Sequence, residues 1–171
     1  ANELPKTANP SAGDYLELYR GLIAEGVREI VSIHITSKGS GAYQAALVAR
    51  QMLLEAMPDL RIEVIDTLNV SMCQGWMVIE AARASAAGRS CADIVALVRR
   101  MMPVARMIQT ADTLKYLYMG GRIGKATHLV GSLLKIKPLI GMEDGVIVPL
   151  GTARSRRAAY EKMVQMVEAA V

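Results

Sequence analysis

Apolar and polar positions follow two alternating rhythms along the first two thirds of the chain, and these rhythms predict strands and helices in turn. Two short β-branched and mostly apolar runs, Val27–Thr36 and Arg61–Asp66, predict buried strands. Apolar residues three or four positions apart predict helices around these runs, over residues 12–25, 42–57, a stretch ending near Gly88, and 91–102. Because strands and helices alternate, we predict an α/β fold with a parallel sheet flanked by helices.

The pattern changes after about Gln109. Short helical segments, a hairpin and a last amphipathic helix are predicted over Asp112–Met119, Leu129–Leu134, Ile136–Met142 with Gly145–Leu150, and Ala153–Val171. We therefore predict an α/β domain over residues 1–110, with a short strand Met107–Thr110 at its end. Residues 111–171 are predicted to begin a second, α+β domain, because a hairpin and one helix are too small to be stable alone.

Composition narrows the function classes. The 171 residues are 52% hydrophobic and carry a net charge of +4, which is too small for a nucleic-acid partner without a clustered patch. Phe is absent and aromatic residues make up 4%, which argues against stacking on single strands. Cys73 and Cys91 have neither disulfide nor zinc spacing, and no run approaches the ~20 apolar residues of a membrane span. No signal peptide is recognised, so we expect a cytoplasmic protein without metal or cofactor.

The most informative segment runs from Thr36 to Gln44, where a buried strand ends in a Gly/Ser loop that leads into a helix. Ligands bind at the carboxyl ends of strands in such sheets, and a helix N-terminus offers free N–H groups to an anion. The hydroxyls of Thr36, Ser37 and Ser40 would add donors, and Gly41 would let a ligand approach the backbone. The segment is therefore either an oxyanion cradle or a helix cap with a tight turn.

Other polar elements allow two interpretations each. Thr7–Ser11 is an anion-binding hydroxyl cluster or an entry turn with a Ser cap. Gly120-Gly121-Arg122 holds a guanidinium for an anion or partner, or is a helix C-cap with an exposed charge. Arg154 and its neighbours open the last helix, where positive charge is unfavourable, so they face an acidic partner or solvent. His34 is interpreted as a histidine of the core or of a sheet face. Asp66 is either a ligand contact or a loop cap.

Taken together, these elements resemble the DegV family of bacterial fatty-acid-binding proteins. The motifs that carry the resemblance are Thr7-Ala8-Asn9-Pro10-Ser11, Thr36–Gln44, Val64-Ile65-Asp66-Thr67, Leu114–Ile123 and Leu133–Leu139. The family pattern also has a strand before residue 1 and a second domain that continues past Val171. We therefore expect the chain to correspond to part of that pattern. Ala8, Asn9, Gly39 and Ala42 depart from it, and two hydroxyl donors are lost.

The resemblance implies a lipid carrier rather than an enzyme, with catalysis expected only in a partner fatty acid kinase. A C14–C18 fatty acid would lie with its tail in an apolar tunnel and its carboxylate at Thr7, Ser40 and the Gly41 N–H, beside Ser37. Arg122 would lie near the acyl phosphate and Arg154 would face the kinase. Two alternatives stay open. One is a structural or regulatory fragment that binds no lipid and self-associates, and the other is an α/β transferase or phosphatase using the Ser40 loop.

Overall fold

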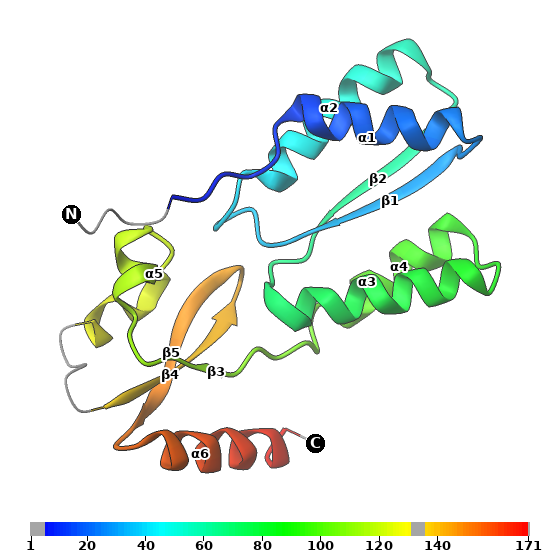
Figure 1. The fold of residues 1–171 in the computed structure, drawn as a ribbon. Coiled ribbons are helices and arrows are strands. Elements are labelled where there is room, and N and C mark those ends of the chain that lie inside the picture. The colour runs from blue at the N-terminus through cyan, green and yellow to red at the C-terminus, as the bar shows by residue number, and fades with distance from the viewer. Residues whose placement is uncertain (1–5, 131–135, 171) are drawn as a thin grey trace.

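The computed structural model describes residues 6–130 and 136–170. Its first part is a two-stranded parallel sheet with two helices on each face (Figure 1). The predicted α/β fold is thus confirmed. The elements are α1 (Ala12–Ala24), β1 (Glu29–His34), α2 (Ala42–Ala56), β2 (Arg61–Asp66), α3 (Ser71–Ala86) and α4 (Cys91–Met101). We call this part, residues 12–101, the parallel unit.

Local sequence explains where these helices begin and end. Ser11 and Asp14 form a capping box, in which the Ser11 hydroxyl accepts from the Asp14 N–H at 3.2 Å and the Asp14 carboxylate accepts from the Ser11 N–H at 2.7 Å. Gly26, with a φ of +94°, lets the chain leave α1 in the left-handed region. At the start of α4 the Ser90 hydroxyl accepts from the Asp93 N–H at 3.2 Å.

Two apolar clusters fill the two faces of the parallel sheet. One lies beneath α1 and α2 and includes the fully buried Tyr19, Leu53 and Ile62. The other lies beneath α3 and α4 and includes Met77 and Val98. The strands pair in parallel from Glu29↔Arg61 to His34↔Asp66, so both end at the same edge. That edge is where a ligand of such a sheet is expected.

The second part is a three-stranded antiparallel sheet of order β3-β4-β5, with α6 packed against it (Figure 1). Its elements are β3 (Gln109–Thr110), α5 (Lys115–Met119), the 3-10 helix η1 (Gly124–Leu129), β4 (Lys137–Glu143), β5 (Val146–Ala153) and α6 (Arg156–Glu168). We call it the antiparallel unit. The β4–β5 turn has positive φ at both Asp144 (48°) and Gly145 (79°), as a two-residue hairpin turn requires.

One sequence prediction fails here. The strand expected over Met107–Thr110 as the end of the parallel sheet is instead β3, which pairs antiparallel with β4. A short apolar run does not specify its partner, and Gly141 of β4 admits the incoming chain, since a Cβ there would lie 2.8 Å from the Met107 carbonyl oxygen. The division of the chain at residue 110 stays a prediction. The helix predicted over Leu129–Leu134 falls mostly outside the described residues.

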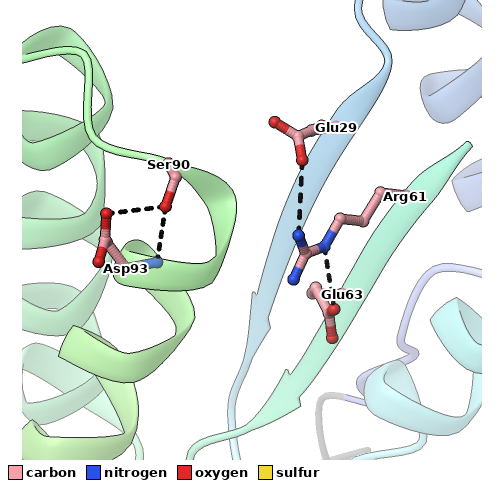
Figure 2. Close-up of polar contacts among 5 residues, drawn as sticks. All are labelled: Glu29, Arg61, Glu63, Ser90 and Asp93. Atoms are coloured by element: carbon pink, nitrogen blue, oxygen red, sulfur yellow. Dashed lines mark hydrogen bonds and ion pairs between the residues drawn. The ribbon is translucent and has the colours of Figure 1, made fainter.

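Charged side chains at the amino ends of the parallel strands pair with one another (Figure 2). Arg61 Nε lies 3.3 Å from Glu63 Oε1, and Arg61 Nη1 lies 3.7 Å from Glu29 Oε1 on the neighbouring strand. Ser90 and Asp93 bond each other at the start of α4. At this end of the sheet one arginine is thus shared by two carboxylates, one from each strand. Among the described helices, none has the length and apolar character needed to cross a membrane.

Candidate functional site

A cavity of about 1330 Å³ lies between the carboxyl end of β2, the end of α4 and the β4–β5 hairpin. This volume exceeds the roughly 300–1,000 Å³ of common small-molecule pockets. Its apolar wall comes from both units and includes Val64, Met102, Met142, Val148 and Leu150. Charged residues also line it, among them the ion-paired Lys125 and Glu143, whose Nζ and Oε2 are 3.5 Å apart. The cavity is thus large enough for a small-molecule ligand and offers it both apolar and charged side chains.

The loop between β1 and α2 runs beside this cavity and keeps unused donors. The Gly39 and Ser40 N–H groups donate to the Thr36 carbonyl at 3.1 and 3.2 Å. The Ser40 hydroxyl accepts from the Ala42 N–H at 3.2 Å, and no side chain caps α2 at Gly41. Within the described residues, neither the Ser40 hydroxyl hydrogen nor the Gly41 N–H has an acceptor. An anion at this helix start would meet free donors and the positive end of the helix dipole.

Thr36 does not serve as an anion donor, contrary to the sequence interpretation of its hydroxyl. It is buried at 3% exposure, and its hydroxyl donates to the Gly145 carbonyl at 2.8 Å. The same oxygen accepts from the Lys38 N–H at 3.2 Å. The acceptor is 109 residues away in the chain, which is why local sequence could not reveal it.

Ser37 and Asp66 occupy the entrance to the loop. Ser37 is exposed, and its N–H donates to Asp66 Oδ1 at 3.2 Å. The same carboxylate oxygen accepts from the Leu68 N–H at 3.0 Å. Of the two interpretations of Asp66, the loop cap is therefore seen, and the residue also lines the cavity. The Ser37 hydroxyl remains available to a ligand, because no described group bonds it.

The N-terminal segment reaches the same loop through Asn9. A Cβ on Gly41 would lie 2.9 Å from Asn9 Oδ1. Glycine at this position is therefore explained by the close approach of the Asn9 side chain to the backbone, and not by the φ of Gly41. Sequence reasoning treated Asn9 only as a departure from the family motif and missed this contact. Thr7 is exposed, and it has no hydrogen bond to any described residue. The structure thus brings the Thr7–Ser11 element to the loop without showing a contact of Thr7 itself.

Arg122 joins the loop from the other unit. Its Nε donates to the Gly39 carbonyl at 3.1 Å, and its Nη1 donates to the Gly120 carbonyl. The helix C-cap interpretation of Gly120-Gly121 is seen, since Gly120 is the C-cap of α5 and Gly121 follows with a φ of +72°. The guanidinium is exposed, so its remaining N–H groups face solvent. The structure therefore holds Arg122 against Gly39 of the loop, and its role as an anion ligand stays a prediction.

The arginines at the start of α6 have different surroundings. Arg154 is exposed and, among the described residues, has no ion pair. Arg156 pairs with Asp112, whose other oxygen lies 2.6 Å from Lys137 Nζ. These two cations hold the pKa of the Asp112 carboxyl below its usual range, Lys137 having the larger effect. The unfavourable position of Arg156 on its helix is thus offset by a carboxylate, while Arg154 stays open to a partner.

His34 lies in a buried polar network below the loop. Ser32 Oγ accepts from the Tyr19 hydroxyl at 2.7 Å and lies 2.8 Å from His34 Nε2. The Tyr15 hydroxyl lies 3.5 Å from His34 Nδ1, and the ring of Tyr43 is tilted against the imidazole. Burial lowers the pKa of His34, against a smaller opposite effect of Asp66. The core interpretation of His34 is thus confirmed, and neither it nor Ser32 lines the cavity.

The predicted ligand-binding residues lie outside the described lining of the cavity. These residues are Thr7, Ser37, Ser40, Gly41 and Arg122, whereas Tyr43, the second residue of α2, belongs to the lining. Sequence reasoning missed the hairpin residues that form the opposite wall. Their one local signal was the Asp144-Gly145 turn, which predicts a hairpin but not what the hairpin packs against.

Comparison with known proteins places the chain in a family. The model of the family described as "Uncharacterised protein, DegV family" matches residues 1–170. A DegV domain-containing protein of Clostridium acetobutylicum is 37% identical over 164 residues, which are 96% of this chain and 57% of that protein. The chain therefore spans a little over half the length of this curated relative.

Two solved structures have the same fold. A fatty-acid-binding DegV family protein from Thermus thermophilus superposes with a TM-score of 0.89 at 31% identity, covering 98% of this chain and 58% of its own. The Streptococcus pneumoniae fatty acid kinase (Fak) B3 protein, solved with linoleic acid, gives a TM-score of 0.86 at 26% identity, with 99% and 59% coverage. The family match, the shared fold and the motifs around the Ser40 loop agree, and the chain belongs to the DegV family.

Proposed function

We propose that this chain binds a long-chain fatty acid, with the carboxylate at the Ser40 loop and the tail in the cavity. The observation that carries the proposal is the joining of two features at one edge of the sheet. A large cavity with apolar and charged lining residues extends to Tyr43 and Asp66, and the loop beside these residues has donors on Ser40 and Gly41 that no described residue accepts from. Fatty-acid binding in the Thermus thermophilus protein of the same fold supports the ligand class.

The chemistry of the loop suits a carboxylate better than a reacting group. A carboxylate needs several N–H or O–H donors, which Ser37, Ser40, Gly41 and Thr7 supply in this proposal. The half-buried Ser32 and the buried His34 have the separation of a nucleophile and base, but neither residue lines the cavity. We therefore propose a carrier, with no covalent step on this chain.

The tail and the carboxylate contribute very different amounts to affinity. Burying a methylene gains about 0.8 kcal/mol, so a 16-carbon tail gains on the order of 10 kcal/mol before ordering costs. A single neutral hydrogen bond contributes only about 0.5–1.5 kcal/mol. The tail therefore sets affinity, and the loop hydroxyls set which way the carboxylate faces.

Presentation to a kinase is the second step of the proposal. The Streptococcus pneumoniae protein of this fold is a fatty acid kinase B3 protein with bound linoleic acid, which supports a kinase partner for this chain. Arg122, fixed by the Gly39 and Gly120 carbonyls, would meet the acyl phosphate with its free N–H groups. Arg154, exposed and without an ion pair in the described chain, would contact the kinase.

The test is native mass spectrometry of the gently purified chain, followed by lipid extraction. We expect an adduct in the mass range of C14–C18 fatty acids, or its appearance after incubation with palmitate. A chain that stays empty after that incubation contradicts binding by residues 1–171 and favours the alternative of a fragment without lipid. Phosphorylation of the bound lipid by a bacterial fatty acid kinase and ATP then tests presentation separately.

Ser40→Ala separates the two contributions. We expect the Kd for palmitate to rise less than about tenfold, since one hydroxyl is lost, while phosphorylation by the kinase falls by more than that. Ser85→Ala, at an exposed position on α3, is the matched control and should change neither value. A loss of palmitate affinity far above tenfold would mean that the carboxylate, not the tail, dominates binding.

A further inference from the structure

Thr36 has every polar group engaged, and its partners belong to three different segments. Its N–H donates to the Asn69 carbonyl at 2.9 Å, in the loop after β2. Its carbonyl accepts from the N–H groups of the Ser40 loop. Its hydroxyl donates to the Gly145 carbonyl at the tip of the β4–β5 hairpin, at 2.8 Å. One buried side chain thus connects the loop, the end of the parallel sheet and the antiparallel unit.

The hairpin tip is shaped to reach Thr36. A Cβ on Gly145 would lie 2.5 Å from Thr36 Oγ1 and 3.1 Å from Leu68 Cδ2, and the φ of +79° at Gly145 is one that other residues rarely adopt. The turn therefore lies in direct contact with both strand-end loops. In the described chain, this is the one hydrogen bond between the hairpin, residues 137–153, and residues 6–104.

The same hairpin forms a wall of the cavity. Met142, Glu143 and Asp144 lead into the tip and line the cavity, as do Val148 and Leu150 on the returning strand. The position of the tip relative to β2 therefore sets the width of the space between Val64 and Val148. A contact that fixes the tip fixes that width.

We infer that Thr36 is a positioning residue for the proposed fatty-acid site, holding the hairpin wall against the strand ends through its bond to the Gly145 carbonyl. This inference rests on the proposed function for its ligand, but the bond acts on the protein alone. Thr36→Val keeps the shape of the side chain, removes the donor and leaves the Gly145 carbonyl and the Lys38 N–H unpaired. The wall then separates more often, and a bound tail escapes faster.

Hydrogen exchange of the ligand-free chain tests the bond without any lipid. We expect Thr36→Val to speed exchange of the amides in residues 143–148 by roughly tenfold, the effect of losing one buried hydrogen bond. Thr36→Ser keeps the hydroxyl and should restore the wild-type rate. Ser32→Ala is the matched control, because Ser32 also bonds two buried partners, Tyr19 and His34, but lies away from the hairpin.

Lipid release provides the second readout. Transfer of radiolabelled palmitate to excess phosphatidylcholine vesicles should be about tenfold faster from Thr36→Val than from the wild type, Thr36→Ser or Ser32→Ala. Unchanged exchange at 143–148, equal effects of the valine and serine variants, or an equal effect of Ser32→Ala would overturn the inference. If the wild type binds no palmitate, the proposed function fails, and the exchange experiment alone then decides whether Thr36 positions the hairpin.

Discussion

The parallel unit and the antiparallel unit are stabilised by different means. In the parallel unit, helices cover both faces of the sheet, and each face buries a large apolar cluster. In the antiparallel unit the two clusters are smaller, and much of β5 is only half-buried. Its hairpin meets the parallel unit through a turn and one hydrogen bond in the described chain. The comparison indicates that the parallel unit supplies a fixed sheet edge to the cavity. The antiparallel unit supplies the hairpin wall, whose position depends on few contacts with the parallel unit.

The largest effect should come from the core of the parallel unit. Leu53 is 1% exposed beneath α1 and α2, and Leu53→Ala should lower the free energy of unfolding by about 3 kcal/mol through lost burial and the cavity left behind. Met52, next in the chain and 49% exposed, is the control, and Met52→Ala should cost well under 1 kcal/mol. Urea denaturation followed by circular dichroism measures both.

Leu139→Ala makes the same deletion in the antiparallel unit, where Leu139 is fully buried between β4 and α6. If the units differ in stability as argued, the chain unfolds in urea through two transitions. Leu139→Ala then lowers the midpoint of the early transition and leaves the later one unchanged, whereas Leu53→Ala shifts the later one. A single transition that both variants shift equally would show that the two units unfold together and that the comparison is wrong.

The contact of the hairpin tip with Thr36 should give the next largest effect. Gly145→Ala adds a Cβ that would lie 2.5 Å from Thr36 Oγ1, and it also places alanine at a φ of +79°. We expect a loss of about 2–3 kcal/mol in unfolding free energy, with faster exchange at the hairpin. Gly88→Ala has a similar φ, +73°, and open space around its Cβ, so it measures the backbone cost alone, about 1 kcal/mol.

The difference between the two glycine variants is the cost of crowding Thr36. Equal losses would mean that the hairpin tip moves away from Thr36 freely and holds no fixed position.

The same difference between units explains what the sequence could predict. The bounds of α1, α4 and β2 depend on local signals, such as the Ser11 capping box and the β-branched run of β2, and these were read correctly. The partner of β3 and the acceptor of the Thr36 hydroxyl depend on segments far away in the chain. Local pattern shows that a strand ends close to Thr36, but not which backbone carbonyl the Thr36 hydroxyl meets.

The candidate site likewise has one part that local sequence predicts and another part that it does not. The Ser40 loop was predicted because a strand, glycines and a helix start are adjacent in sequence. The cavity wall was not, since Val64, Met102 and Val148 meet only after the two units pack. The contact of Asn9 with the loop was not predicted either. The side chain that would crowd a Cβ on Gly41 lies more than thirty positions earlier in the chain.

The smallest effect concerns the pH dependence of the parallel unit. Burial lowers the pKa of His34, which Ser32, Tyr15, Tyr43 and Asp66 surround, so the folded chain resists protonation there. Below about pH 6.5 the unfolded chain takes up a proton that the folded chain does not, and stability falls as the pH falls. One histidine limits this slope to about 1.4 kcal/mol per pH unit. Asp14 and Asp93, whose pKa values are lowered by bonds to Ser11 and Ser90, act only in more acidic solution, near and below pH 4.

His34→Gln should therefore flatten the stability profile of the parallel unit between about pH 7 and pH 5, while the loss below pH 4 remains. His128→Gln makes the same substitution at an exposed position in the antiparallel unit and is the matched control. Urea midpoints measured at half-unit intervals of pH give the comparison. If His34→Gln kept the wild-type slope over that range, the proton uptake would belong to another group, and the buried network beneath the Ser40 loop would be a neutral scaffold at every pH tested.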